Sequence, residues 1–271
     1  MKNLNMFCLS LEPNHYQFIK KLGYLPVGLG NKDFDNNWLS DKSGNNISKK
    51  NKNYGEYTYH YWIWKNYLDK LDNNWIGFCQ YRKFWSLKNY KNININSLNT
   101  QVLKEIPKEL ESYDSILGEP MFVNQWRTMK FLKTGLKIFI KKPSLLFSKK
   151  KRNLNFHFDW MHGENNLSKA INLLDNENRD DFSKFVNSEV SFNPHNMVIC
   201  KSKMNLKKYY EDLFPWLERC EKLFGFENLK GYGETRIYGF LAERFLSYWF
   251  KKYTKHTTMP IIFHDIRDDL N

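Results

Sequence analysis

The sequence predicts an α/β fold in which a mixed, mainly parallel sheet is flanked by helices. Short apolar runs typical of strands alternate along the chain with longer segments of helical spacing. The 271 residues are 41% hydrophobic and 17% aromatic, which is enough apolar surface for one large core. We therefore expect a single domain over residues 1–271, with a basic helical insertion near residues 120–158.

The strands are predicted from apolar runs that end at turn-forming residues. The second run ends at Gly28 and Gly30, and the fourth is closed by Gly118 and Pro120. The third run, W-I-G-F-C, leads directly into the polar sequence Q-Y-R-K. The expected strands cover residues 5–11, 24–30, 75–79, 113–117 and 190–200, with an edge strand at 259–263.

Helices are predicted where apolar side chains recur every three or four residues. Residues 31–45 and 89–100 are polar, and we expect them to form surface loops. The expected helices cover residues 54–71, 103–110, 129–140, 206–224 and 234–250.

The charge balance predicts an acidic partner. The chain carries 42 basic and 29 acidic residues, a net charge of +13, which suits phosphate, nucleic acid or an anionic membrane. Its four cysteines show no C-x-x-C spacing, which argues against a zinc site or a disulfide framework and favours a reducing cytoplasm. Residues 1–10 lack the apolar run of a signal peptide, and no stretch is long enough for a membrane span.

The basic segment suggests contact with a membrane surface. Residues 120–158 contain no acidic side chain. Between Met129 and Lys141, four lysines recur at helical spacing opposite apolar side chains, and a Lys-Lys-Lys-Arg run then ends at Arg152. This composition is typical of a helix that lies on anionic lipid. The alternative is an ordinary surface helix with a solvated lysine face.

Residues 46–84 combine many polar and aromatic side chains with a following strand. Aromatic rings beside hydrogen-bonding groups suit a site that stacks on rings and binds hydroxyl groups, as a nucleotide or a sugar requires. Arg82 and Lys83 follow the strand at 75–79, and open α/β sheets bind their ligands at the carboxyl ends of strands. The alternative is an amphipathic helix with a solvated face, followed by an edge strand.

Three motifs in this segment resemble those of the bacterial capsule and lipopolysaccharide glycosyltransferases long filed as a domain of unknown function. The family pattern N-I-S-x-x-N corresponds to residues 46–51, E-L-T-x-x-Y-W-x-W-K-N to 56–66, and G-x-x-H-Y-R-R to 77–83. Gln80 stands where the family usually has His, and Lys83 where it has Arg. The resemblance implies a nucleotide-sugar-dependent transferase with a GT-A-like fold. Further matches in type lie at residues 41–46, 196–199 and 236–244.

The resemblance and the residue chemistry together suggest the site residues. Gly28, for example, could let the backbone approach a phosphate. The expected donor-binding residues are Gly28, Asp41, Asn46, Ser48, Lys50, Asn51, Glu56, Trp62, Lys65, Gln80, Tyr81, Arg82 and Lys83. The residues expected on the acceptor side or in support of the site are His157, Asn196, Arg236 and Arg244.

Glycosyl transfer requires positive charge to stabilise the departing diphosphate. Arg82 and Lys83 are the expected cations. Mg²⁺ or Mn²⁺ held by Asp33 and Asp35 is an alternative, since carboxylate oxygens suit these ions. We favour transfer without a metal, because this D-x-D lies in a polar loop and not at the end of a strand.

An inverting transfer also requires a base for the acceptor hydroxyl. The candidates are Asp159, His157 and Glu243. We favour Asp159, because its aromatic neighbours in the sequence can desolvate a carboxylate and raise its pKa.

The leading hypothesis is a cytoplasmic glycosyltransferase at the inner face of the bacterial plasma membrane. It would transfer a hexose from a nucleotide sugar, such as a UDP-hexose, to a lipid-linked or oligosaccharide acceptor of a capsule, lipopolysaccharide or other surface glycan. The runner-up is a non-catalytic module that binds anionic lipid or nucleic acid. Nucleic acid is disfavoured, because the aromatic residues have core-like spacing and no known binding motif is present.

Glu56 and Lys65 lie nine residues apart, about two and a half helical turns, and should bracket a ligand or meet different partners.

Overall fold

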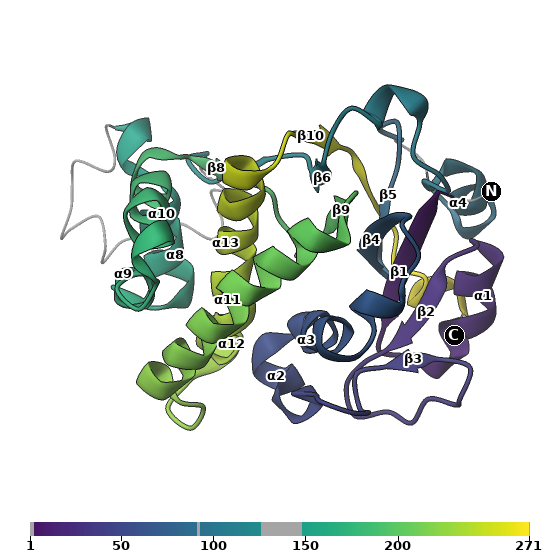
Figure 1. Ribbon diagram of the computed structural model, residues 1–271, viewed down its shortest axis with the longest axis horizontal. Helices are drawn as coiled ribbons and strands as arrows, with labels where there is room; N and C mark the ends of the chain where they lie inside the picture. Colours follow the sequence, from purple (N-terminus) through teal and green to yellow (C-terminus); the bar gives the residue numbers. More distant parts are fainter. Residues whose placement is uncertain (1–2, 91–92, 126–147, 271) are drawn as a thin grey trace.

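The computed structural model describes residues 3–90, 93–125 and 148–270, and a nine-stranded sheet forms the centre of this part of the chain (Figure 1). Seven strands follow the order β10-β6-β9-β4-β1-β2-β3, β5 extends the sheet from β4, and β11 pairs with β5. A separate two-stranded sheet joins β7 and β8. The strands are β1 (Leu4–Ser10), β2 (Leu25–Gly28), β3 (Leu39–Ser40), β4 (Trp75–Gln80), β5 (Lys83–Trp85), β6 (Ser115–Gly118), β7 (Met121–Phe122), β8 (Ser191–Phe192), β9 (Val198–Cys200), β10 (His256–Met259) and β11 (Ile261–Phe263).

Most strands of the large sheet run in one direction. β1 pairs in parallel with β2 and β4, and β2 pairs in parallel with β3. β9 lies antiparallel between β4 and β6, so β6 and its parallel partner β10 keep the direction of β4. β5 is antiparallel to both β4 and β11. The expected mixed, mainly parallel sheet is therefore confirmed.

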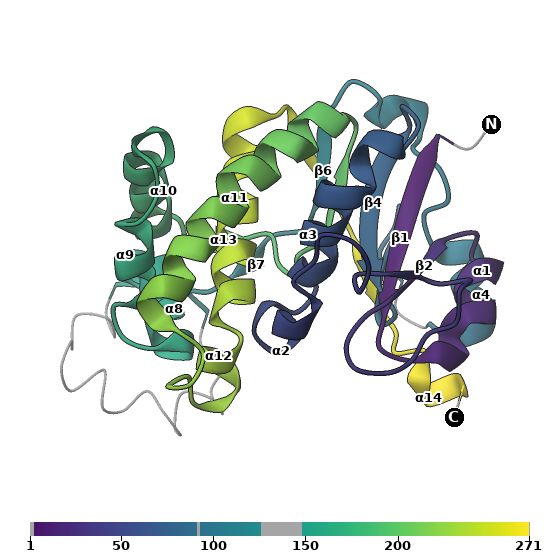
Figure 2. The same cartoon turned by 60° about the horizontal axis from the view of Figure 1, so that its bottom comes forward.

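The helices cover both faces of this sheet. Helices α1 and α4 lie on one face, and α3, α11 and α13 lie on the other (Figures 1 and 2). Helices α8 to α10 lie beyond α13, on the side away from β1 and β2. The helices are α1 (Tyr16–Lys21), α2 (Asn51–Tyr54), α3 (Tyr57–Asn66), α4 (Ile95–Gln101), α8 (Leu154–His162), α9 (Asn166–Ile171), α10 (Asn176–Ser188), α11 (Lys203–Phe224), α12 (Gly231–Thr235), α13 (Ile237–Tyr253) and α14 (Arg267–Leu270). Short 3-10 helices cover Pro13–His15, Ser48–Lys50, Leu68–Lys70, Lys108–Leu110 and Lys149–Lys151.

The alternation of side chains along β1 explains why the sheet is buried on both faces. Met6 and Cys8 point into the cluster that also contains Ile19 of α1, whereas Phe7 and Leu9 point into the cluster formed with α3, α11 and α13. Successive side chains of a strand point to opposite faces, so a strand covered on both sides must be apolar throughout. This requirement is why the apolar runs of the sequence located the central strands.

Backbone conformations break two of the predicted elements. The helix expected at 54–71 is interrupted at Gly55, which has φ 58° and ψ −130°, a conformation that essentially only glycine adopts. The strand expected at 190–200 is also wrong as a single element. His195 and Asn196 have positive φ angles of 82° and 57°, and this turn separates β8 from β9.

Three further predictions need correction. The helix expected at 103–110 does not form. Pro107 lies within this segment, and Leu103 donates its backbone N–H to Trp85 instead of to a helical carbonyl. The loop expected at 89–100 contains α4, which begins at a reciprocal cap between Asn94 and Ser97. The helix expected at 234–250 is divided at Arg236 into α12 and α13.

The basic insertion lies largely outside the described residues. The helix expected at 129–140, with Lys130, Lys133, Lys137 and the neighbouring Lys141, falls within residues 126–147 and stays a prediction. Arg152, at the end of the basic run, is buried and donates from Nε to the carbonyl of Asn124 at 3.1 Å. Within 3–90, 93–125 and 148–270, no helix combines the length and apolar character that crossing a bilayer requires.

Gly28 should be intolerant of even a single methyl group. A Cβ atom at this position would lie 2.4 Å from the ring of Phe34, so the ring would have to move. We expect Gly28→Ala to lower the free energy of unfolding by about 1–3 kcal/mol, the usual cost of overpacking. Urea unfolding measures the change. Asn31→Ala, at an exposed position in the following loop, is the control and should leave stability nearly unchanged. An unaltered Gly28→Ala variant would contradict the packing described.

Candidate active site

A cleft lies at the carboxyl ends of β1, β2 and β4. These three strands are parallel, so their ends meet at one edge of the sheet, where α/β proteins bind ligands. The cleft holds ≈ 70 Å³, which is room for a few water-sized groups and is closer to a phosphate than to a whole nucleotide. Its described lining consists of Ser10, Leu11, Leu29, Asn51, Gly55, Glu56, Gln80, Tyr81, Arg82 and Arg236.

Glu56 connects three separate parts of the chain at this cleft. Its Oε1 accepts a hydrogen bond from Nε2 of Gln80 at 3.1 Å, and its Oε2 pairs with the guanidinium of Arg236 at 3.1 Å. The side chains of Glu56 and Arg236 are only 18% and 26% exposed, so water screens this ion pair weakly. Gly55 makes room for it, because a Cβ atom there would lie 2.0 Å from Nη2 of Arg236.

Gln80 makes three hydrogen bonds at the end of β4. Besides Glu56, its amide nitrogen donates to the carbonyl of His195 at 2.9 Å, and its Oε1 accepts from Nζ of Lys83 at 3.2 Å. A primary amide offers two N–H donors beside its carbonyl acceptor, and this arrangement uses both donors. A neutral imidazole has only one donor, so the Gln in place of the family's His matches this set of contacts.

The cleft is rich in positive charge. Arg82 packs its guanidinium near the ring of Tyr81, 5.7 Å from its centre, and no carboxylate of the described residues lies within ion-pair distance of Arg82. Burial lowers the pKa of Lys83, and Arg82 and Arg236 lower it further, whereas Glu56 opposes the shift. Arg82 and Arg236 line the cleft with one carboxylate, Glu56, and Lys83 bonds to the lining residue Gln80, so the described lining has an excess of positive charge for an anion.

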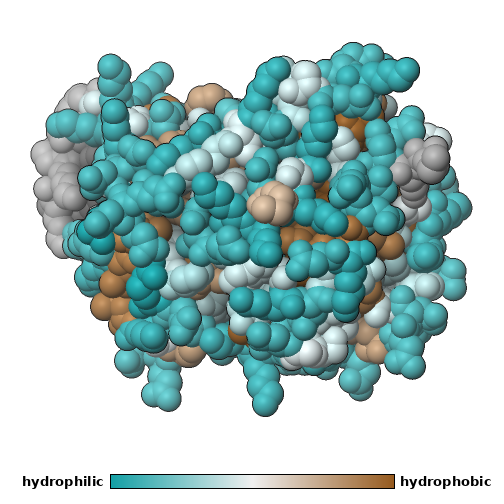
Figure 3. Space-filling model, viewed as in Figure 1, coloured by the Kyte–Doolittle hydropathy of each residue, from teal (hydrophilic) through white to brown (hydrophobic). Residues whose placement is uncertain are grey.

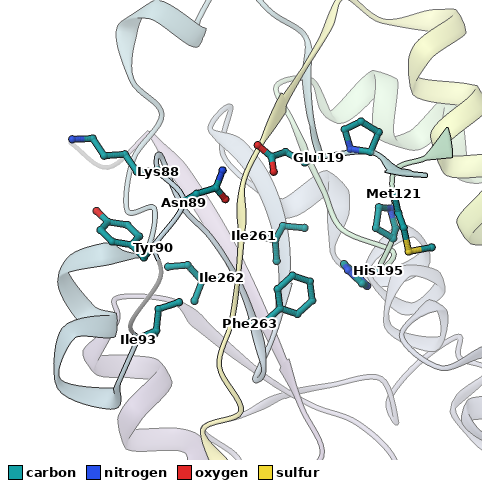
Figure 4. Close-up of a pocket in the computed structure, with 12 residues that line it drawn as sticks. Lys88, Asn89, Tyr90, Ile93, Glu119, Met121, His195, Ile261, Ile262 and Phe263 are labelled. Atoms are coloured by element: carbon teal, nitrogen blue, oxygen red, sulfur yellow. The ribbon is translucent and has the colours of Figure 1, made fainter. Parts of the chain in front are cut away.

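His195 is held by its backbone and not by its ring. Its N–H donates to Oε1 of Glu243 at 2.6 Å, while its carbonyl accepts from Gln80. Both contacts fix the left-handed backbone that turns the imidazole towards the neighbouring cavity (Figure 4). Burial, with the nearby Lys83 and Arg82, lowers the pKa of His195 to about 3, so its imidazole is neutral at pH 7.

Glu243 and Arg244 support this turn from α13. The Oε2 atom of Glu243 accepts from Nη1 of Arg244 at 2.5 Å, and Nη2 of Arg244 lies 3.3 Å from Nδ1 of His157. The guanidinium of Arg244 also covers the ring of Phe192 at 3.8 Å. Each oxygen of Glu243 accepts one of these hydrogen bonds, so Glu243 positions His195 in this structure, and its expected role as a base stays a prediction.

Other expected donor residues shape the segment before α3. Asn46 accepts from the backbone N–H and hydroxyl of Ser48, and Asn51 donates to the carbonyl of Gly55 at 3.0 Å. Trp62 donates from Nε1 to the hydroxyl of Ser43 at 3.1 Å. Of the three expected residues Asn46, Ser48 and Trp62, none lines the cleft, whereas Asn51 does.

Lys50 and Lys65 lie in a different cavity, between α3 and α11. Lys50 pairs with Glu221 at 2.7 Å, and the ammonium of Lys65 lies 3.4 Å from the centre of the Trp64 ring. Glu56 and Lys65 therefore meet different partners, which is one of the two arrangements expected from their spacing. They do not bracket the same cleft.

The loop residues Asp33, Asp35 and Asp41 lie outside the cleft. Asp33 and Asp35 are exposed, and Asp35 accepts from the backbone N–H of Asn37 at 2.8 Å. Asp41 is fully buried, and its burial outweighs the effect of the Thr58 side chain, which favours the charged carboxylate. Within the described ranges, no three His, Cys, Asp or Glu side chains are grouped as metal ligands would be.

Asp159 lies away from the strand ends, whereas Asn196 belongs to the turn beside the end of β4. Asp159 lies on α8, where it accepts from the backbone N–H of Asn165 at 3.1 Å, and α8 is separated from β4 by α13 (Figures 1 and 2). Asn196 follows His195 and is nearly buried. The proposed roles of both residues stay predictions.

Sequence reasoning missed Ser10 and His195 as residues of the site. Ser10 ends β1 and hydrogen-bonds to Nδ1 of His15 at 2.7 Å. A polar residue at the end of an apolar run was the available signal. For His195 the signal was weaker, because its role depends on contacts with Gln80 and Glu243, which are distant in the sequence.

The profile of the family described as "Domain of unknown function (DUF4422)" matches residues 12–255. The chain belongs to this family. A solved apo structure of WbbM, a bifunctional glycosyltransferase, is similar to the DUF4422 chain with a TM-score of 0.71 and 18% sequence identity. The similarity covers 97% of this chain and 45% of the WbbM chain, so this chain spans about half the length of that protein. No curated protein matches the DUF4422 chain in sequence. At this identity the likeness establishes the α/β fold.

Replacing Asp41 by Asn should stabilise the protein more at pH 8 than at pH 4. Burial raises the pKa of the Asp41 carboxyl in the folded chain. Its contribution to stability is therefore present below the unfolded pKa of about 3.9 and is lost as the pH rises through the folded pKa. An amide of the same shape removes the buried charge. Urea unfolding of both proteins at the two pH values measures the difference, and an equal effect at pH 4 and pH 8 would contradict the assignment.

Proposed function

We propose that this chain is a glycosyltransferase that takes its sugar from a nucleotide-sugar donor and works as a single GT-A-like domain. The observation that carries the proposal is that Arg82 and Arg236 line a cleft with one carboxylate, Glu56, at the carboxyl ends of parallel strands, while Lys83 bonds to the lining residue Gln80. The likeness of the fold to a glycosyltransferase supports the same conclusion.

The cleft suits the diphosphate of the donor. Its volume fits a small anionic group, and guanidinium groups bind phosphate oxygens through paired N–H donors. Arg82 has no carboxylate partner in the described structure and is the first candidate. Lys83 and Arg236 add charge that stabilises the diphosphate as it leaves. The nucleoside and the sugar would extend from the cleft on either side.

The proposed reaction transfers the sugar from the diphosphate to an acceptor hydroxyl, and the hydroxyl proton needs a base at the cleft. The oxygen of an acceptor hydroxyl forms a bond to the anomeric carbon of the donor, and the bond from that carbon to the diphosphate oxygen breaks. The diphosphate leaves with the electron pair, and the hydroxyl proton passes to a carboxylate. We assign this role to Glu56, because it is the acid that lines the cleft among the described residues, whereas Asp159 lies on α8.

The sequence supports a finer proposal about the setting of the enzyme. A hexose donor and a capsule or lipopolysaccharide acceptor agree with the motifs at residues 46–83, and the basic residues at 129–152 favour a peripheral position on the inner face of the plasma membrane. The alternative of a non-catalytic module for anionic lipid or nucleic acid is favoured by the net charge of +13 and by the basic segment at residues 120–158. Figure 3 shows that the face seen in Figure 1 is mainly hydrophilic.

A panel of UDP-, GDP-, dTDP- and CMP-sugars tests the proposed function. Each nucleotide sugar is incubated with the protein, and thermal stabilisation and slow release of the free nucleotide are measured. We expect one nucleotide class to raise the melting temperature and to be hydrolysed. Binding to anionic vesicles or to nucleic acid, with no response to any nucleotide sugar, would favour the non-catalytic module.

Arg82→Ala should abolish most of the transfer while the protein stays folded. A preorganised charge that stabilises a leaving group contributes about 2.7–4 kcal/mol, so turnover should fall by about 10²–10³-fold. Arg267→Ala is the matched control, since this guanidinium packs on the same Tyr81 ring at 5.1 Å but pairs with Asp265 and does not line the cleft. Near-normal turnover of folded Arg82→Ala would remove Arg82 from the site.

The full chain should bind anionic vesicles in a salt-sensitive manner. Residues 130–152 contain eight lysines and one arginine, and each basic residue near an anionic surface contributes about 1 kcal/mol. Flotation should show binding that is lost when Lys130, Lys133, Lys137 and Lys141 become Glu. Reversing four exposed lysines elsewhere, Lys49, Lys52, Lys169 and Lys184, gives a control of equal net charge. Equal flotation with neutral and anionic vesicles would contradict this prediction.

A further inference from the structure

We propose that a second, larger cavity next to the cleft is the acceptor site, and that it takes an acceptor whose sugar carries an apolar group. This inference rests on the proposed function and names the substrate class for it. The cavity holds ≈ 680 Å³, within the range of about 300–1,000 Å³ that is usual for small-molecule sites. Its described lining consists of Lys88, Asn89, Tyr90, Ile93, Glu119, Pro120, Met121, Pro194, His195, Ile261, Ile262 and Phe263.

The two cavities share a thin wall. Gln80 lines the cleft, His195 lines the larger cavity, and the Gln80 amide donates to the His195 carbonyl at 2.9 Å. Lys83 bonds to the same Gln80 side chain. A diphosphate beside Arg82 and an acceptor beside His195 would therefore lie on either side of one residue pair. The anomeric carbon of the donor must come within about 3–3.5 Å of the acceptor hydroxyl, so the two sites have to adjoin, and these cavities adjoin at this residue pair.

The lining along β11 is apolar. Figure 4 shows Ile261 and Phe263 pointing to the same side of the strand as His195 and Met121. Phe263 is 61% exposed, and its ring meets the His195 ring edge-on at 5.1 Å. A large aromatic ring left exposed inside a cavity provides surface for a ligand to cover. A wholly hydroxylated glycan would place polar groups against Ile261 and Phe263. An apolar group attached to the sugar would instead bury these two side chains.

His195, one of the polar residues of the lining besides Lys88, Asn89 and Glu119, can orient the sugar. The imidazole of His195 is neutral at pH 7, so it can accept a hydrogen bond from a hydroxyl group without adding charge. Its backbone is fixed by Glu243 and Gln80, which limits where the ring can point. The accepting sugar therefore lies at the His195 end of the cavity, and the apolar group extends along Ile261 and Phe263.

Paired glycosides test this assignment. Octyl and methyl glycosides of galactose, glucose, mannose and N-acetylglucosamine are offered with the donor found by the nucleotide-sugar panel, and product is measured by mass spectrometry. Hydrolysis of the donor without an acceptor is measured in parallel. We expect octyl glycosides to be used with a KM at least about tenfold lower than that of their methyl partners, since apolar groups in a pocket discriminate by such factors.

Phe263→Ala should remove this preference. The KM for octyl glycosides should rise by about tenfold, towards that of the methyl glycosides. Phe122→Ala is the control, because Phe122 is 52% exposed but does not line the cavity. Normal donor hydrolysis with no preference for octyl glycosides, no transfer to any of them, or no effect of Phe263→Ala would overturn the acceptor inference alone. The absence of both hydrolysis and transfer would overturn the proposed function as well.

Discussion

The partly buried carboxylate of Glu56 is the constraint on which the arrangement of the site depends. It bonds to Gln80, 24 residues away, and to Arg236, 180 residues away, so it joins the start of α3 to the end of β4 and to the junction of α12 and α13. Without this negative charge, Arg82, Lys83 and Arg236 would repel one another in a poorly solvated cleft. Glu56 thus allows the cations to be in place before any anion binds.

This preorganisation links the fold to the chemistry. The parallel strands bring Ser10 and Gln80 to one edge of the sheet, and the break at Gly55 leaves space for the guanidinium of Arg236. Charges that are already positioned need no reorganisation when a diphosphate departs, and they act more strongly where water is partly excluded. The turn at His195, held by Glu243, then lies between the strand-end cleft and the larger cavity.

Features of the fold and the site that depend on local sequence pattern could be predicted from the sequence. Both faces of β1 and β4 are buried, so their apolar runs stand out, and the polar residues that follow β4 indicated Arg82 and Lys83. Features that depend on contacts between residues far apart in the sequence could not be predicted in this way. The turn at His195 follows from contacts with Gln80 and Glu243, and the place of Lys65 in the cavity between α3 and α11 follows from the packing of these two helices. Asp41 and Trp62 matched family motifs but lie away from the cleft lining.

The central claim is that the cleft binds the diphosphate of a nucleotide sugar. A crystal structure of the full chain with the nucleoside diphosphate selected by the nucleotide-sugar panel tests it most directly. The account predicts phosphate oxygens within hydrogen-bond distance of Arg82 or Arg236, at the ends of β1 and β4. A nucleotide bound elsewhere, such as the Lys50–Lys65 cavity between α3 and α11, with the strand-end cleft empty, would contradict it.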